Sequence, residues 1–197
     1  MTRLTIVLLT AIALLLPIAA VQAVSDTSIY TVRQMCSAPD RQDFTVFDQE
    51  ALPGILTEII LHDPPDAEYH ERVVVSAIKA LGAMHVDSAV PVLIEKSDEY
   101  PTTCIYWLAD YADPDAVDTI TGFLDNDDPS VRYEAVDALG RLKDPDETTS
   151  DEYIFSLSDA LMAAANRKKI EVDTDVLDAL DAAILHLMDI VLKPGTN

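Results

Sequence analysis

The side chains best suited to binding a metal or assisting catalysis are four histidines and a large excess of carboxylates. The histidines are His62, His70, His85 and His186. None stands in a His-Glu-x-x-His spacing and the chain has no Cys-x-x-Cys pair, so both of these zinc patterns are missing. His62 and His70 flank an acidic stretch, but ordinary surface histidines explain this pair better than a metal centre does. We expect neither a metal nor any other cofactor.

The acidic run at 125–128 is the pattern closest to a calcium loop. It reads Asp125-Asn126-Asp127-Asp128. Pro129 occupies the fifth position, where a calcium loop needs an oxygen ligand, and the turn glycine and twelfth-position glutamate of an EF-hand are absent. We interpret the run as an inter-helix loop that ends in a helix cap, with weak cation binding as the alternative.

Nucleophilic catalysis is not indicated by the serines. Ser76, Ser88 and Ser130 lack a Gly-x-Ser-x-Gly setting, and the chain has only 5 glycines. The 35 Asp and Glu residues permit chance carboxylate pairs, as any acidic surface does. We expect that the protein is not an enzyme, and a site assembled from scattered carboxylates and histidines remains the alternative.

The helices that would position the candidate side chains are predicted most clearly between Asp128 and Pro145. Asp128 suits an N-cap, and Pro129 suits the first helical position because the N–H it lacks would have no partner there. An apolar stripe follows at steps of three and four residues: Val131, Ala135, Ala138, Leu139 and Leu142. Arg132 falls outside the stripe, and Asp144-Pro145 is expected to end the helix. The stripe predicts a neighbouring helix that buries it.

The pattern recurs upstream at intervals of about 30 residues. Ala80-Leu81-Gly82 repeats Ala138-Leu139-Gly140, and Leu108 takes the same place in a degenerate third unit. A partner helix is expected after each upstream unit, at about 87–96 and 116–124. No strand pattern is present, so the sequence predicts an all-α fold.

The helix predicted between Asp128 and Pro145 resembles the first helix of a HEAT repeat. The residues that carry the resemblance are Asp128, Val131, Arg132, Ala135, Ala138, Leu139, Gly140 and Asp144. The closest subtype is the short, phycobilisome-lyase-type HEAT repeat, and the resemblance covers roughly residues 66–145. It implies an α-α superhelix, here a HEAT-like solenoid of about three helix pairs with flanking cap helices. It also implies a scaffold without transferable catalytic residues.

The N-terminus has the composition of a secretory signal peptide. Arg3 precedes an apolar run from Leu4 to Ala20, which is too short to span a bilayer and ends in the small-residue pattern Val21-Gln22-Ala23. We expect cleavage after Ala23, a periplasmic or secreted protein, and no stable membrane insertion afterwards.

The expected domain organisation has four parts. Residues 1–23 are the signal peptide, and residues 24–43 form an irregular leader segment with a short helix around Ile29 to Met35. Residues 44–192 form the HEAT-like solenoid domain, and residues 193–197 are a C-terminal tail. Because each repeat cannot bury its apolar face alone, the repeats are expected to stack within one domain.

The chain is strongly acidic, with 35 Asp and Glu against 13 Lys and Arg and a formal charge of −22. This charge repels nucleic acid and anionic membranes, so neither is an expected partner. The acidity has two explanations: solubility, including adaptation to a salty medium, or attraction to a basic partner or divalent cations.

Two cysteines, Cys36 and Cys104, are available for a single disulfide if the chain is exported. The repeat alignment supports the alternative equally, because Cys104 occupies the place of Ala135, where a small buried thiol packs well. Both alternatives remain open.

Two groups of residues are candidates for contacting a protein partner. Tyr100 and Tyr106 are expected at an exposed aromatic rim, whereas the repeat alignment places Trp107 and Tyr111 in the core. The resemblance implies that the second helix of each pair lines a binding groove. The groove candidates are Glu95, Lys96, Asp118, Thr119 and Thr121.

These observations favour an exported scaffold or adaptor that binds another protein, through a groove whose acidity suits a basic segment. An acidic envelope protein that binds divalent cations weakly or is adapted to salt is the first alternative. An enzyme with a dispersed site is the second.

Overall fold

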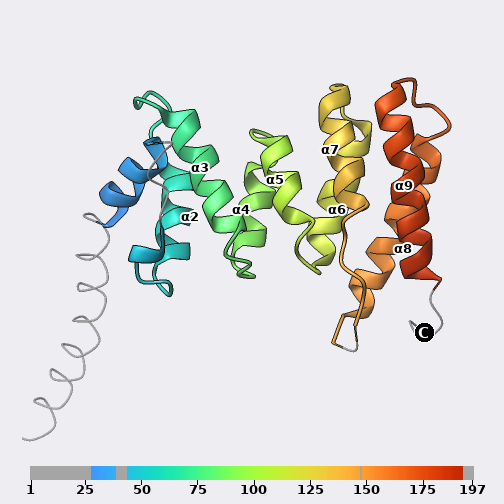
Figure 1. The fold of residues 1–197 in the computed structure, drawn as a ribbon, viewed down its shortest axis with the longest axis horizontal. Helices are drawn as coiled ribbons and strands as arrows, with labels where there is room; N and C mark the ends of the chain where they lie inside the picture. Colours follow the sequence, from blue (N-terminus) through green and yellow to red (C-terminus); the bar gives the residue numbers. More distant parts are fainter. Residues whose placement is uncertain (1–27, 39–43, 147, 193–197) are drawn as a thin grey trace, which may run out of the picture. The chain divides into compact units, whose positions relative to one another are not determined.

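The computed structural model describes residues 28–38, 44–146 and 148–192, and all regular structure in these ranges is helical (Figure 1). The predicted all-α fold is therefore confirmed. The predicted signal peptide and the tail at 193–197 lie outside the described residues. The chain divides into two compact units, Met1–Ala77 and Ile78–Asn197, with the boundary inside helix α3. The predicted single solenoid domain over 44–192 stays a prediction.

The first unit contains the helical residues 28–37, the short helix η1 (Phe44–Val46), α2 (Leu52–His62) and the start of α3 (His70–Gly82). Val32 and Cys36 of the first helix are fully buried. The leader is thus more regular than expected, since its short predicted helix extends over 28–37. Two apolar side chains one turn apart anchor it, and the polar residues between them hide this signal in the sequence.

Asp63 at the end of α2 connects three segments of this unit. Its carboxylate accepts a hydrogen bond from the Arg33 guanidinium and lies 2.8 Å from Nδ1 of His70. The Asp63 side chain is 1 % exposed, and a buried carboxylate is stable only when donors surround it. This pairing fixes the 28–37 helix and the start of α3 within the unit.

The second unit consists of two layers of helices. One layer contains α5 (Pro101–Leu108), α7 (Pro129–Leu139) and α9 (Thr174–Val191), and the other contains α4 (Ala89–Lys96), α6 (Pro114–Gly122) and α8 (Asp151–Arg167). Within the layers α5 packs on α7, α7 on α9 and α6 on α8, while α4–α5 and α8–α9 pack across them (Figure 1). The short helix η2 (Phe123–Asp125) follows α6 directly. This is a HEAT-like helical repeat, as predicted.

Helix α7 begins where the sequence predicts. The Asp128 carboxylate accepts the Ser130 N–H at 2.8 Å, and Pro129 is the first helical residue. The helix ends earlier than expected, at Leu139 rather than near Asp144. The carbonyls of Leu142 and Lys143 instead accept hydrogen bonds from His186 and Tyr153 at 2.9 and 3.0 Å. Side-chain donors from α8 and α9 therefore satisfy the carbonyls of the residues that follow α7.

The repeat register is confirmed by burial. Leu81, Leu108 and Leu139, the equivalent leucines of the three sequence repeats, are all 0 % exposed. The apolar stripe predicted between Asp128 and Pro145 is buried throughout, from Val131 at 6 % on α7 to Leu142 at 2 % just after it. A period of three and four residues thus identified the inward face, because only that face meets the neighbouring helices.

Glycines allow close approach at two equivalent repeat positions. A Cβ on Gly82 would overlap the ring of Trp107, so the indole packs directly against the backbone of α3. A Cβ on Gly140 would lie 3.8 Å from the Cα of Ala183 on α9. A side chain at Gly82 would therefore displace the indole, whereas at Gly140 the α9 backbone lies at an ordinary van der Waals distance.

Candidate protein-binding surfaces

An open groove of about 630 Å³ lies between α4 and α6. Its floor is apolar and its edges are acidic. The lining residues are Asp87, Val90, Pro91, Ile94, Glu95, Asp113, Asp115, Asp118 and Thr119. Five of these residues carry carboxylates and none is basic. The nearby Lys96 pairs with Glu99 at 3.1 Å, so its charge is already matched outside the groove.

The groove contains part of the predicted binding set. Glu95, Asp118 and Thr119 line it, whereas the Thr121 hydroxyl donates to the Val117 carbonyl at 2.8 Å within α6. The sequence analysis missed three acidic residues of the rim: Asp87, Asp113 and Asp115. They lie at the starts of α4 and α6, where acidic residues are common because they cap helices. The sequence therefore gave no separate indication that they also line a groove.

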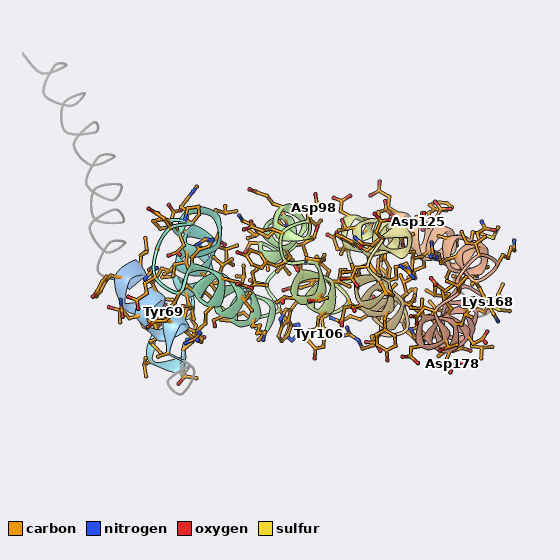
Figure 2. The ribbon with its side chains drawn as sticks, turned by 90° about the horizontal axis from the view of Figure 1, so that it is seen from above. Tyr69, Asp98, Tyr106, Asp125, Lys168 and Asp178 are labelled. Atoms are coloured by element: carbon orange, nitrogen blue, oxygen red, sulfur yellow. The ribbon has the colours of Figure 1, made fainter. Side chains whose placement is uncertain are left out.

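The predicted aromatic rim lies in the other layer. In Figure 2, Tyr106 and Asp178 lie on one side of the second unit, and Asp98 and Asp125 lie on the opposite side. Tyr106 is 46 % exposed, Tyr100 and Trp107 are half-buried and Tyr111 is buried. The structure therefore separates Tyr106 from the α4–α6 groove and does not bring the five predicted residues into one site.

Tyr106 and Trp107 line a pocket of about 300 Å³ that we call the aromatic pocket. Its lining residues are Lys79, Thr102, Thr103, Tyr106, Trp107 and Glu134. The two rings meet edge to face, with centroids 5.1 Å apart. The Arg141 guanidinium lies 4.5 Å from the Tyr106 centroid, and its Nη2 donates to the Tyr106 carbonyl at 3.3 Å. A cation–π contact thus already forms at the edge of this pocket.

Glu134, which lines the aromatic pocket, has a buried side-chain oxygen without a hydrogen-bond donor among the described residues. Its Oε1 atom is buried and accepts no hydrogen bond from any described residue. The Nη2 of Arg141 is 3.9 Å from this oxygen, which is too far for a hydrogen bond. Burial and the nearby Asp137 raise the pKa of the Glu134 carboxyl, and Arg141 opposes the shift. The sequence analysis did not single out Glu134.

Glu134 also lines a second cavity, of about 660 Å³, that extends from α7 to the start of α9. The lining residues are Thr102, Pro129, Ser130, Tyr133, Glu134, Asp173, Asp175, Asp178 and Ala179. The two cavities share Thr102 and Glu134. The second cavity contains four acidic residues and no basic residue, so the surface beside Glu134 is acidic.

A buried ion-pair cluster fixes the turn between α8 and α9. Arg132 donates from Nε and Nη2 to both oxygens of Glu171, at 2.8 and 3.0 Å, and from Nη1 to the carbonyls of Asn126 and Asp127. Arg167 donates to the same carboxylate at 2.9 Å. The hydrogen bonds from Arg132 hold the pKa of the Glu171 carboxyl well below its usual range. Placing Arg132 outside the buried positions was therefore wrong.

The position of Arg132 could not be derived from periodicity. Its spacing puts it outside the apolar stripe, yet the residue is 7 % exposed because Glu171, 39 positions later, neutralises it. Glu171 Oε1 also accepts the N–H groups of Val172 and Asp173 at 2.9 Å. The cluster is structural, since donors surround the carboxylate and none of the three cavities includes it.

The histidines do not converge on one another. His62 lies 3.8 Å from Glu58, His70 contacts Asp63, His85 packs against Trp107, and His186 donates to the Leu142 carbonyl. Within the described ranges, no three His, Cys, Asp or Glu residues are grouped so that they could hold a metal ion. Asp125 lies beside Arg167 at 3.3 Å, and the carboxylate of Asp128 caps α7.

Cys36 and Cys104 are free thiols, and each is fully buried in its own unit. Cys104 fills the inner position that the repeat alignment assigned to it. Burial raises the pKa of both thiols to about 12. The buried-thiol alternative describes their state in this structure, and the Cys36–Cys104 disulfide stays a prediction.

Residues 95–150 match the family described as HEAT repeats. The matched segment runs from the end of α4 through α7 and lies within the second unit. No curated protein matches the chain in sequence. HEAT repeats are generally scaffolds for protein interaction, and the fold of the second unit is a HEAT-like helical repeat. In the part of the chain that the structure describes, no helix is long and apolar enough to cross a membrane.

Proposed function

We propose that this protein is a non-catalytic scaffold that holds a basic segment of another protein in the α4–α6 groove. The groove itself carries the proposal, because five carboxylate residues line it together with the apolar Val90, Pro91 and Ile94. Carboxylates would attract and orient a Lys- or Arg-rich segment, and the apolar side chains would contribute affinity by burying a side chain between the cations. The match of residues 95–150 to HEAT repeats supports the same class of function.

The proposal is tested with synthetic peptides in which lysine or arginine residues flank a leucine. The purified protein should bind these peptides and bind poorly to counterparts in which glutamine replaces each cation. Asp118→Lys should weaken binding about tenfold, roughly 1.4 kcal/mol, because it places a cation where the peptide's own cations would lie. Fluorescence anisotropy of labelled peptides measures the affinity.

A matched control separates the groove from the general acidity of the chain. Asp159→Lys makes the same charge change at an exposed position on α8, outside the groove lining. Its effect on peptide affinity should stay within about twofold, because exposed charges beyond a Debye length are screened at physiological salt. Equal weakening by both substitutions would reject the groove as the binding surface.

We also propose that the protein acts outside the cytoplasm. The support is the sequence of residues 1–23, with its cation, short apolar run and small-residue end. Mass spectrometry of the protein from its native host should give a chain that begins at Val24. An intact N-terminus on the mature protein would reject this part of the proposal.

A further inference from the structure

The aromatic pocket lies on the opposite layer of helices from the α4–α6 groove and has different chemistry. Two aromatic rings, two threonines, the Glu134 carboxylate and one cationic residue, Lys79, line it. Its rings are held in place, because Trp107 packs on the Gly82 backbone and Tyr106 lies under the Arg141 guanidinium. The pocket is therefore a formed cavity between α3, α5 and α7.

The Glu134 carboxylate is incompletely neutralised within the protein. Its Oε1 atom is buried without a hydrogen bond from the described residues, while the side chain keeps 24 % exposure and lines both adjoining cavities. Arg141, the cation recorded beside it, is engaged by Asp137 at 3.0 Å and by the Tyr106 carbonyl. A carboxylate in this setting gains from a further cation, because the attraction is stronger at a partly buried position than in water.

We propose that the aromatic pocket binds an arginine side chain carried by a basic segment of a protein partner. A guanidinium is planar and weakly hydrated, so it can stack on Trp107 or Tyr106 while it pairs with Glu134. Arg141 already makes such a contact on Tyr106, at 4.5 Å from the ring centroid. The neighbouring cavity adds Asp173, Asp175 and Asp178, which favour further cations along the same segment. The proposal does not depend on the α4–α6 groove.

The single tryptophan of the chain lines this pocket, so it reports binding directly. The purified protein is titrated with a short capped peptide that contains one arginine among glycines and serines. Trp107 fluorescence and the indole N–H signal in nuclear magnetic resonance spectra should change saturably. The same peptide with citrulline, which keeps the shape and lacks the charge, should produce at most a weak change. Equal affinity for the citrulline peptide would overturn the proposal.

Two charge-matched variants assign the binding to a surface. Glu134→Gln should weaken arginine-peptide binding roughly tenfold or more, because it removes the pairing charge at nearly constant shape. Asp159→Asn removes one negative charge at an exposed position on α8, outside the linings of the groove and of both cavities, and should leave Trp107-detected affinity within about twofold. Unchanged binding by Glu134→Gln, or equal loss in both variants, would reject the pocket. This outcome is separate from the groove test, which uses Asp118→Lys and peptide anisotropy.

A folding control accompanies the titration. Glu134→Gln replaces a carboxylate that has an unpaired buried oxygen, so the melting temperature of the variant should match or exceed that of the wild type. Tyr106→Leu provides a second variant, which keeps apolar volume on α5 and removes an aromatic face. It should also weaken the arginine peptide, and unchanged affinity in a folded Tyr106→Leu protein would contradict the stacking part of the proposal.

Discussion

The Glu171 carboxylate is the most heavily hydrogen-bonded acidic group in the second unit, and its removal should be costly. Glu171→Ala leaves Arg132 buried without its partner, and breaking a buried pair in this way costs about 3–5 kcal/mol. Asp159→Ala, at an exposed position on the preceding helix α8, should change stability by less than about 0.5 kcal/mol. Urea unfolding measures both. A loss below about 1 kcal/mol for Glu171→Ala would show that the cluster contributes little.

The pH dependence of this contribution has a defined sign. The folded pKa of Glu171 lies well below its unfolded value of about 4.3, so ionised Glu171 stabilises the folded state above that value. The contribution is lost as the pH falls through the folded pKa. The stability difference between wild type and Glu171→Ala should therefore be constant from neutral pH to about 5 and shrink in stronger acid.

The two thiols should be unreactive while the protein is folded. Burial raises the pKa of Cys36 and Cys104 to about 12, so almost no thiolate is present at neutral pH. Labelling with a thiol-specific disulfide reagent should therefore be slow in buffer and rapid in denaturant, with two thiols titrated per chain. Absence of labelling after denaturation without reductant would instead indicate a disulfide.

At the scale of the helices, Gly82 has the least room for a side chain among the described glycines, because Trp107 packs against it. Gly82→Ala should destabilise the protein by about 1–3 kcal/mol, because a methyl group has no space beside the indole. The Trp107 fluorescence spectrum should shift as the ring moves. Gly122→Ala, at a helical glycine with no atom within 4 Å of the added carbon, serves as the control.

The control should have the opposite sign to the test. Alanine favours a helix over glycine by about 0.5–1 kcal/mol, so Gly122→Ala should be neutral or stabilising. Thermal unfolding of both variants measures the difference. If Gly82→Ala were as stable as Gly122→Ala, the packing of Trp107 on α3 would be looser than the structure indicates.

At the scale of the whole molecule, a charge of −22 predicts opposite salt effects on folding and on binding. Raising sodium chloride from about 0.01 M to about 1 M shortens the Debye length about tenfold, which screens self-repulsion and should raise the melting temperature. The same change should weaken binding of a basic peptide. Differential scanning fluorimetry and peptide anisotropy measure the two effects.

Calcium separates screening from specific ion binding. Sodium and potassium chloride should act equally, and calcium chloride at matched ionic strength should add nothing further. A larger melting-temperature rise with millimolar calcium would support the alternative of a cation-binding acidic protein, because binding to the folded state stabilises it by mass action.

The periodicity of Val131, Ala135 and Leu139, together with the cap Asp128-Pro129, was enough to predict a buried helical face and its start. These features are local, since capping and face periodicity depend on residues within a few positions of one another. The equivalence of Leu81, Leu108 and Leu139 likewise followed from the repeat spacing. The all-α class and the helical-repeat architecture were therefore determined by the sequence.

Only the tertiary structure decided which charges are buried and which surfaces they form. Arg132 is inside because Glu171, far along the chain, neutralises it, and Tyr106 and Asp118 lie on opposite layers although both were candidates for one binding set. Glu134 was identified as a candidate binding residue only from the structure, where one of its carboxylate oxygens is buried without a hydrogen-bond donor in the described part of the chain. Pairing between distant residues depends on how the helices stack, and a one-dimensional pattern does not contain that information.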